Sequence, residues 1–235
     1  MGASLPTEPV FATANVGHGC LLDSRRALVH AAQGWMAVAD LHHGFELNRV
    51  RNHGTLLPQW SMAATERRLM ALLQHHKPRT LILNGDIMDG GGSVRETERF
   101  IKRVRDCVAD LILVEGNHDR PAVKQGLPFV QIHRSGGFVF HHGHKWMRTW
   151  RDLGEAAGEI HICGHEHPAL QLNDGAGMKP RFPALIQDRF AERPLVEHWI
   201  LPAFSPWAGG TVYESANERL ATWMCAEGTI LPVKL

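Results

Sequence analysis

Five short apolar runs in this chain each end in a cluster of residues that can bind metal ions. Every run has about the length of a buried strand, and every cluster contains Asp, Asn or His. Ligands of parallel sheets lie at the carboxyl ends of the strands, so one sheet edge would gather these side chains from five places. The pattern predicts a site for more than one metal ion. The runs and their clusters are residues 35–39 with 40–42, 80–83 with 84–89, 111–114 with 115–119, 138–140 with 141–144, and 160–163 with 164–167.

The first half of the chain alternates between predicted strands and predicted helices. Leu69, Leu72 and Leu73 have helical spacing, and Ser93 with Glu96 has the S-x-x-E form of a capping box. This alternation is typical of a parallel sheet with crossover helices. The expected order is strand 35–39, helix 59–76, strand 80–84, helix 93–109 and strand 110–114.

The remaining segments are less regular. Residues 10–29 predict a hairpin or two short strands that lead into the sheet, and after residue 120 apolar runs alternate with Gly and Pro, which indicates a second, more antiparallel sheet. Residues 172–194 are rich in Gly, Pro, Arg and Asp, and predict a long loop or hairpin over the site. The length of 235 residues fits a single domain spanning residues 1–235.

Composition excludes several classes of protein. The formal net charge of +1 gives no global attraction to nucleic acid or to anionic membranes. The four cysteines form no C-x-x-C pair, which argues against a zinc knuckle, a redox motif or a disulfide framework and favours a reducing compartment. No segment resembles a secretory signal or a membrane-spanning helix, so we expect a soluble, cytoplasmic protein.

The side chains in the clusters indicate which ions they would bind. Carboxylate and imidazole together suit Mn²⁺, Fe²⁺ and Zn²⁺, and none of the candidate ligands is a thiolate. Asp40 and His42 stand two residues apart after a strand, so in extended geometry both side chains point to the same side. Two ions about 3.5–4 Å apart need a bridging group, and Asp86 is the candidate. The adjoining glycines allow tight turns and close approach of the backbone: Gly85, Gly116, Gly143 and Gly164.

Some residues near the clusters have open roles. Only one of several neighbouring imidazoles needs to bind an ion, so His43, His141 and His144 are alternatives that packing or solvent could equally explain. Asp89 fits a hydrogen-bond acceptor for a ligand better than a ligand itself. Trp146 with Arg148, or Trp150 with Arg151, could stack a base and hold a phosphate, although a helix with one buried face explains them as well.

In their order along the chain, the motifs D-x-H, G-D-x-x-D, G-N-H-D, H-G-H and G-H-x-H resemble those of the calcineurin-like metallophosphoesterases, from Asp40 to His167. The resemblance implies an α/β sandwich of two mixed β-sheets flanked by helices, in the order α/β/β/α. It also implies two divalent ions, most readily Mn²⁺. His118 would be the catalytic histidine that contacts phosphate and protonates the leaving oxygen, oriented by Asp119, and Asn117 would also contact substrate. The implied ligands are Asp40, His42, Asp86 and His167 for one ion and Asp86, Asn117, His142 and His165 for the other.

A finer resemblance covers residues 39–44 and 201–210, which look like a subgroup called ligase-associated DNA-damage-response endonucleases, related to SbcD-like nucleases. It implies Mn²⁺-dependent hydrolysis of phosphodiesters by metal-activated hydroxide, with DNA as the implied substrate. Association with a DNA-repair helicase or ligase follows only by analogy. A phosphatase or pyrophosphatase acting on a small nucleotide or another phosphoester is the alternative. A non-catalytic scaffold is a third hypothesis, although such relatives lose ligands and this chain has the complete set.

Overall fold

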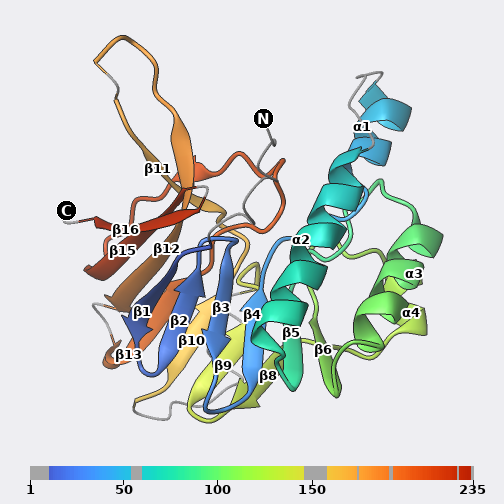
Figure 1. The fold of residues 1–235 in the computed structure, drawn as a ribbon, viewed down its shortest axis with the longest axis horizontal. Coiled ribbons are helices and arrows are strands. Elements are labelled where there is room, and N and C mark those ends of the chain that lie inside the picture. Colours follow the sequence, from blue (N-terminus) through green and yellow to red (C-terminus); the bar gives the residue numbers. More distant parts are fainter. Residues whose placement is uncertain are drawn as a thin grey trace, which may run out of the picture.

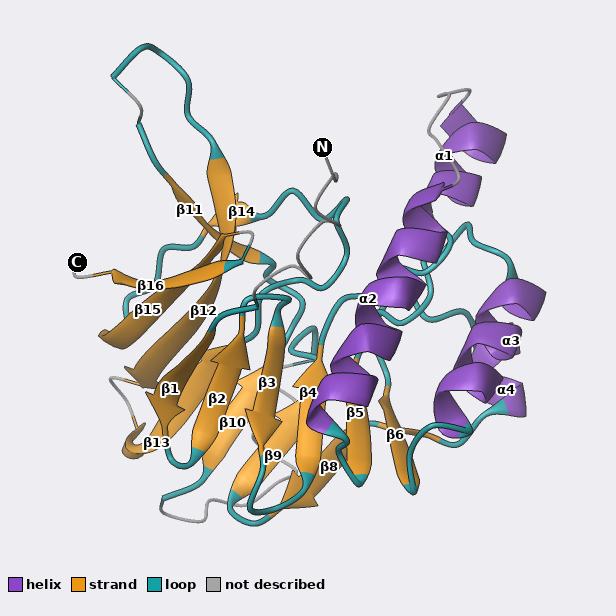
Figure 2. Cartoon of the chain, viewed as in Figure 1, coloured by secondary structure: helices purple, strands orange, loops and turns teal. Residues whose placement is uncertain are grey.

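Two β-sheets packed face to face organise the part of the chain that the structure describes (Figure 1). The structure is a computed structural model, and it describes residues 11–53, 60–145, 158–173, 175–190, 193–226 and 228–233. The helices lie on one side of this pair of sheets (Figure 2).

The first sheet has seven strands in sequence order. Its first four strands pair antiparallel as a meander, and the last three are added in parallel. Parallel neighbours need a crossover, and helices α2 (Trp60–His76) and α3 (Val94–Arg105) supply two of them. The strands are β1 (Thr13–Gly17), β2 (Cys20–Asp23), β3 (Ala27–His30), β4 (Trp35–Val38), β5 (Thr80–Asn84), β6 (Asp110–Val114) and β7 (Phe129–Val130).

The second sheet contains the nine later strands. They are β8 (Ile132–Ser135), β9 (Phe138–His141), β10 (Ile160–Cys163), β11 (Pro168–Gln171), β12 (Arg181–Phe190), β13 (Arg193–Ile200), β14 (Thr211–Val212), β15 (Glu218–Ala226) and β16 (Thr229–Val233). The order is β14-β11-β12-β13-β10-β9-β8, and β15 pairs with β12 and β16. Most pairs are antiparallel, as predicted for this half, but β10 is parallel to both β9 and β13, and β11 is parallel to β14.

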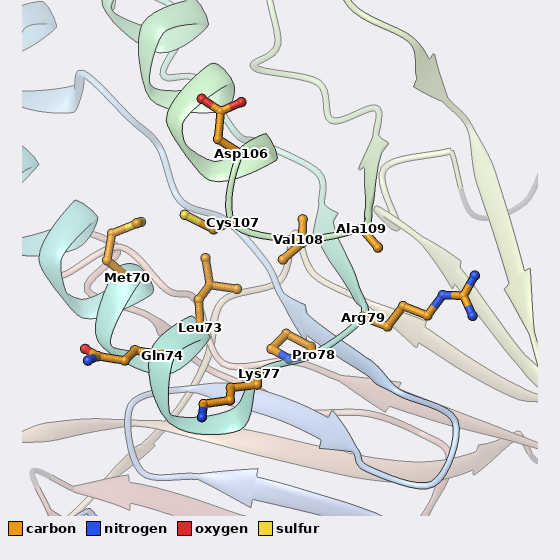
Figure 3. Close-up of a pocket in the computed structure, with 10 residues that line it drawn as sticks. All are labelled: Met70, Leu73, Gln74, Lys77, Pro78, Arg79, Asp106, Cys107, Val108 and Ala109. Atoms are coloured by element: carbon orange, nitrogen blue, oxygen red, sulfur yellow. The ribbon is translucent and has the colours of Figure 1, made fainter.

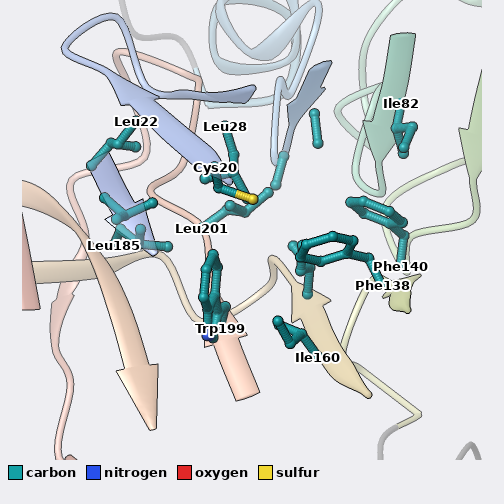
Figure 4. Close-up of a cluster of buried hydrophobic side chains, with 14 of the residues drawn as sticks. Cys20, Leu22, Leu28, Ile82, Phe138, Phe140, Ile160, Leu185, Trp199 and Leu201 are labelled. Carbon is teal, nitrogen blue, oxygen red and sulfur yellow. The ribbon is translucent and has the colours of Figure 1, made fainter. Parts of the chain in front are cut away.

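Alternation along the strands divides the core into two layers. Trp35 and Ala37 of β4 point into the space between the sheets, and Met36 and Val38 point toward the helices. The layer between the sheets joins side chains from both, including Phe140 and Trp199 (Figure 4). The helix-side layer receives Leu69, Leu72 and Leu73 from α2 and Phe100, Ile101 and Val104 from α3. These two layers hold the carboxyl ends of β4, β5, β9 and β10 in place.

The predicted helices and strands of the first half are confirmed, with small changes at their ends. Ser93 caps α3 by accepting a hydrogen bond of 3.4 Å from the backbone N–H of Glu96, but the helix ends at Arg105, four residues before the predicted end. Two short helices were not predicted, α1 (Phe45–His53) and α4 (Pro121–Gly126). Among the described residues, no helix follows α4.

Of the two alternatives for residues 172–194, a long loop or a hairpin, the structure has the hairpin. Residues 181–190 form β12, which pairs with β11, β13 and β15, and Leu185 is fully buried there. The polar residues in this segment have partners in the two sheets. Gln187 donates to the backbone carbonyl of Val16 at 2.8 Å, and Asp188 is paired with Arg219. Only the tip of the β11–β12 hairpin is a loop, and Figure 1 shows it projecting from the sheets.

Candidate metal centre

Five strand ends from two sheets meet at the candidate site. Asp40 and His42 follow β4, Asp86 follows β5, and Asn117 follows β6, all in the first sheet. His142 follows β9, and His165 with His167 follows β10, in the second sheet. The loops are joined by backbone hydrogen bonds, such as the bond of 2.9 Å from the N–H of His42 to the carbonyl of Asp86. The structure therefore brings the side chains of all five clusters together.

Two groups of potential metal ligands share one residue, Asp86. The first group is Asp40, His42, Asp86 and His167, and in it the possible ligand atoms lie within 4.8 Å of one another. The second is Asp86, His142 and His165, on the same criterion. A third group, His42 with Asp89 and His118, overlaps the first. The first two groups coincide with the two predicted ligand sets apart from Asn117, whose Oδ1 lies 3.0 Å from Nε2 of His142.

The two oxygens of Asp86 face different groups. Its Oδ1 lies 3.3 Å from Nε2 of His142, and its Oδ2 lies 3.8 Å from Nε2 of His42. In the first group, Nε2 of His167 is 3.2 Å from Nε2 of His42 and 3.4 Å from Oδ1 of Asp40. Two ligand atoms about 2.1 Å from one ion and about 90–110° apart are about 3.0–3.4 Å from each other. The separations of 3.2, 3.3 and 3.4 Å are therefore those expected between two atoms that bind the same metal ion.

Protonation states suit metal binding at Asp86 and His42. Burial would lower the imidazole pKa of His142 and His167, but the carboxylates of Asp86 and Asp40 outweigh it and raise that pKa, so an ion that binds there competes with a proton. Burial alone would raise the pKa of the Asp86 carboxyl, but hydrogen bonds from His142 and from the backbone of His118 hold it well below its usual range. Burial lowers the pKa of His42, so its imidazole is neutral near neutral pH. An ionised carboxylate and a neutral imidazole are the forms that bind metal ions. The residues present therefore fit the two divalent ions of the prediction.

Backbone conformation sets the ligand positions apart from the rest of the chain. Eight non-glycine residues in the described ranges have positive φ, and five of them are predicted ligands. Such conformations cost of order 1–3 kcal/mol each and concentrate at functional sites. Asp40 and His42 therefore meet at the centre through left-handed backbone and not through the extended geometry that was expected for them. The five are Asp40 (φ 56°), His42 (φ 46°), Asp86 (φ 46°), His165 (φ 71°) and His167 (φ 45°).

The adjoining glycines make room for the ligands. A Cβ on Gly116 would lie 2.1 Å from the backbone nitrogen of Asp86 and 2.2 Å from its Oδ1. A Cβ on Gly164 would lie 2.6 Å from Oδ2 of Asp40, and one on Gly85 would lie 2.2 Å from Nδ1 of His142. These separations are far below van der Waals contact, so a larger residue would displace a ligand.

His118 lies at the open side of the centre. Its side chain is 46% exposed, its Nε2 is 4.0 Å from Oδ2 of Asp86, and its ring centroid is 5.0 Å from that of His42. Asp40, Asp86 and His142 are almost completely buried. A substrate that reaches the buried ligands would therefore meet His118 at the entrance, where the prediction needs it.

Asp119 does not make the contact that was expected for it. Its Oδ1 accepts a hydrogen bond of 2.9 Å from the backbone N–H of Met88, and its Oδ2 accepts one of 2.8 Å from that of Gly116. Within the described ranges, no hydrogen bond joins Asp119 to the imidazole of His118. The carboxylate instead ties the loop after β5 to the loop after β6. The expected orientation of the His118 ring by Asp119 is therefore not found in this structure.

The neighbouring residues with open roles lie outside the two groups. His43 places Nδ1 3.0 Å from Oγ1 of Thr97 and Nε2 3.0 Å from Oε1 of Glu66, so both ring nitrogens are engaged elsewhere. Successive side chains of a strand point to opposite faces, so His141 points away from the face that His142 occupies. The centroid of the His141 ring lies 5.6 Å from that of His161. Residues 146–151, with the Trp and Arg pairs, lie outside the described residues.

Asp89 lies on the side of His42 away from the shared Asp86. Its Oδ1 is 3.8 Å from Nδ1 of His42, and its Oδ2 accepts hydrogen bonds from the amide of Asn48 and, at 3.3 Å, from the backbone N–H of Gly91. The position is that of a residue that orients a ligand, as the sequence suggested, although at 3.8 Å the two atoms are not hydrogen-bonded.

Sequence reasoning missed the support that the later part of the chain gives to Asp40. The backbone N–H of Phe204 donates to the carbonyl of Ala39 at 2.8 Å, and that of Ser205 donates to the carbonyl of Asp40 at 3.0 Å. Nearby, Nε1 of Trp207 donates to Oε1 of Glu46 at 2.7 Å. The signal was present, because these residues belong to the 201–210 segment that carries the finer resemblance.

A pocket of about 740 Å³ lies away from the candidate metal centre (Figure 3). Its walls are the C-terminal part of α2 and residues that immediately precede β5 and β6, including Arg79 and Ala109. It is therefore at the amino ends of those strands, and the metal ligands follow their carboxyl ends. Strands of five residues separate the two sites by about 16 Å.

Comparison with known proteins agrees with the geometry. The family model for calcineurin-like phosphoesterases matches residues 36–228. No curated protein sequence matches the chain. The crystal structure of the Pseudomonas putida nuclease MPE is similar with a TM-score of 0.64 at 21% identity, over 95% of this chain and 100% of that one. The E. coli phosphoesterase Yfce is similar with a TM-score of 0.43 at 16% identity, over 81% of this chain and 86% of that one.

The described residues contain no helix that is both long enough and apolar enough to cross a membrane. The family match covers most of the chain, including every predicted ligand, and the ligands form two adjoining groups in the structure. The chain therefore belongs to the calcineurin-like phosphoesterase family and is a metal-dependent phosphoesterase.

Proposed function

We propose that this protein is a phosphodiesterase that cleaves nucleic acid, most readily DNA, with two Mn²⁺ ions as cofactors. The observation that carries the proposal is the position of Asp86, whose two oxygens face two separate groups of ligands. A carboxylate in this position can join two ions at one phosphate. The similarity to the fold of a nuclease over 95% of this chain adds support for a nucleic-acid substrate.

The proposed ligands divide between the two ions as the sequence resemblance implies. One ion would take Asp40, His42, Asp86 and His167, and the other would take Asp86, Asn117, His142 and His165. Bound there, two divalent ions would neutralise phosphate oxygens and lower the pKa of a bound water. Mn²⁺ is proposed because the set mixes carboxylate, amide and imidazole groups, which suit it better than Mg²⁺ or Ca²⁺.

The residues of the chain would then position the phosphate and move one proton. Asn117 and His118 are exposed at the entrance, where they can contact the oxygens of a bound phosphodiester. His118 would donate a proton to the leaving oxygen, which an alkoxide needs near neutral pH, and a general acid of this kind contributes roughly 10²–10⁴ in rate. Asp119 would act as a positioning residue, because it fixes the loop that carries both.

The surroundings suit a long substrate better than a small one. The ligands Asp40, Asp86 and His142 are buried, whereas Asn117 and His118 at the entrance lie in the open, so a chain that continues beyond the phosphate on both sides can approach. The four cysteines, Cys20, Cys107, Cys163 and Cys225, are free thiols, which supports the proposed cytoplasmic location.

Hydrolysis by protein stripped with a chelator tests the proposal. Bis-p-nitrophenyl phosphate, p-nitrophenyl phosphate and a fluorescent single-stranded DNA are each incubated with and without added Mn²⁺. The expected result is Mn²⁺-dependent cleavage of both the diester and the DNA. His118→Ala is expected to reduce cleavage of the DNA far more than cleavage of the diester, because p-nitrophenoxide leaves without a proton. His75→Ala is the matched control, because this exposed histidine lies on α2 outside the centre.

Three other outcomes would change the conclusion. Cleavage of the small diester without cleavage of DNA would exclude the nuclease and favour a nucleotide-sized substrate. Preference for the monoester would favour a phosphatase. Metal analysis that finds no bound ion at saturating Mn²⁺ would favour a non-catalytic scaffold.

A further inference from the structure

A pocket of about 180 Å³ adjoins the second group of ligands, and the proposed reaction does not use it. Gly143, next to His142, and Glu166, next to His165, form part of its wall. The rest comes from the second sheet and from the segment after β14. The pocket is thus only one or two residues along the chain from two proposed metal ligands.

Aromatic rings give the pocket a rigid wall. Phe190 and His198 are stacked, with ring centroids 5.0 Å apart and an angle of 26° between the rings. Nε2 of His198 lies 3.0 Å from Sγ of Cys163, which holds the imidazole in place. Tyr213 contributes a further ring, and the guanidinium of Arg219 lies 5.6 Å from its centre. Aromatic surfaces of this kind are those on which nucleobases stack in proteins that bind single strands.

The pocket also offers the side-chain amide of Asn217. The backbone N–H of Asn217 donates to Oγ of Ser215 at 3.0 Å, which fixes the residue. The side-chain amide of Asn217 makes no hydrogen bond with any described residue, so both its donor and its acceptor are available. An amide can pair with the edge of a base through one donor and one acceptor.

We propose that this pocket binds the base of the nucleotide that adjoins the cleaved phosphate, with Tyr213 and Phe190 in contact with the base and Asn217 on its polar edge. The volume supports one base, since pockets for drug-sized ligands are larger, at about 300–1,000 Å³. This inference rests on the proposed nucleic-acid substrate and specifies how that substrate is held. It predicts a preference for phosphates that carry a base.

Calorimetric titration of the Mn²⁺-loaded protein tests the inference without relying on turnover. The probes are the four deoxynucleoside 5′-monophosphates and 2-deoxyribose 5-phosphate, which has the same phosphate and sugar but no base. At least one nucleotide is expected to bind about tenfold more tightly than the sugar phosphate, given the usual strength of base stacking. Asn217→Ala is expected to reduce this ratio to twofold or less. Asn173→Ala is the matched control, because this exposed asparagine lies on the tip of the β11–β12 hairpin.

A second pair of variants guards against loss of folding. Tyr213→Leu is expected to remove the preference, and Tyr213→Phe, which keeps the ring, is expected to retain it. The inference is overturned if no nucleotide binds more than twofold more tightly than 2-deoxyribose 5-phosphate, or if Asn217→Ala leaves the ratio unchanged. Hydrolysis of methyl p-nitrophenyl phosphate separates the two proposals, because this diester has no base. If it is cleaved while the base has no effect, only the base pocket is excluded, whereas absence of any Mn²⁺-dependent cleavage excludes the phosphodiesterase itself.

Discussion

The backbone N–H of His118 donates a hydrogen bond of 2.8 Å to Oδ1 of Asp86. The residue proposed to protonate the leaving oxygen is thus anchored to the residue proposed to join the two ions. A change at Asp86 therefore disturbs metal binding and the position of the acid together, whereas a change to the His118 side chain leaves this backbone bond intact.

Asp86→Asn is expected to lose both ions and nearly all activity. The amide cannot supply two charged oxygens, and the loss of several kcal/mol of transition-state stabilisation corresponds to about 10³-fold or more in kcat. Elemental analysis and steady-state kinetics measure the two effects. Asp110→Asn, at a partly exposed carboxylate that starts β6, should behave as the wild type. An Asp86→Asn enzyme that kept two ions and normal kcat would exclude Asp86 as the bridge.

His118→Gln should retain its ions, and its defect should depend on the leaving group. p-Nitrophenoxide leaves without a proton, so a missing general acid matters little for that product, whereas an alkoxide leaving group needs the proton and should suffer roughly 10²–10⁴-fold. Comparison of kcat for a p-nitrophenyl diester and for a dinucleotide measures this difference. Equal defects on both substrates would assign His118 to phosphate binding rather than to proton donation.

Gly116→Ala should disrupt the centre through sterics alone. The new methyl group would meet the backbone and carboxylate of Asp86 at 2.1–2.2 Å, and neither can withdraw because both are held in the loop. We expect a loss of about 1–3 kcal/mol in the free energy of unfolding together with weaker metal binding. Gly209→Ala is the control, because a Cβ there meets no atom within 4 Å. Denaturant titration and metal content should change for the first variant only.

The free energy of unfolding should fall as the pH is lowered, in part through His198. Burial lowers the pKa of this imidazole to about 3, against an ordinary value of 6.5. Between these values the unfolded chain binds the proton and the folded chain does not, so this contribution is complete above pH 6.5 and is lost as the pH falls toward 3. From pH 7.5 to pH 5 the loss is about 2 kcal/mol. Urea unfolding at both pH values should show a smaller difference for His198→Gln, and an unchanged one for the exposed control His75→Gln.

The first half of the fold could be predicted because the spacing of its apolar residues in the sequence matches the faces that its helices and strands bury in the structure. The alternation of Trp35 to Val38 and the spacing of Leu69, Leu72 and Leu73 match the surfaces that these residues bury. For residues 172–194 the sequence left a loop and a hairpin open, because Gln187 and Asp188 lie in a sheet whose partners come from distant segments. Polar residues read as a loop when those partners are not visible in the sequence.

The sequence indicated the candidate ligands more completely than the hydrogen bonds that hold their loops in place. Ligands such as Asp40 and His167 stand in short motifs, so their chemistry is local in the sequence even though their proximity is not. The contact between Asp119 and the backbone of Met88, in contrast, joins loops 31 residues apart. The hydrogen bonds of Phe204 and Ser205 to the end of β4 are also long-range, and no spacing rule indicates them.

The left-handed backbone at five proposed ligands limits which amino acids those positions can accept. Apart from glycine, Asn, Asp and His enter this conformation most readily. A replacement by a branched or bulky residue would therefore be penalised by the backbone even where the loss of a metal ligand were tolerated. The substitutions Asp40→Asn and Asp86→Asn isolate the coordination chemistry, whereas alanine at the same positions adds a backbone cost. Few amino acids could replace the present ones at these positions without a cost in backbone energy. The identity of each ligand is therefore constrained by its backbone conformation as well as by the ions.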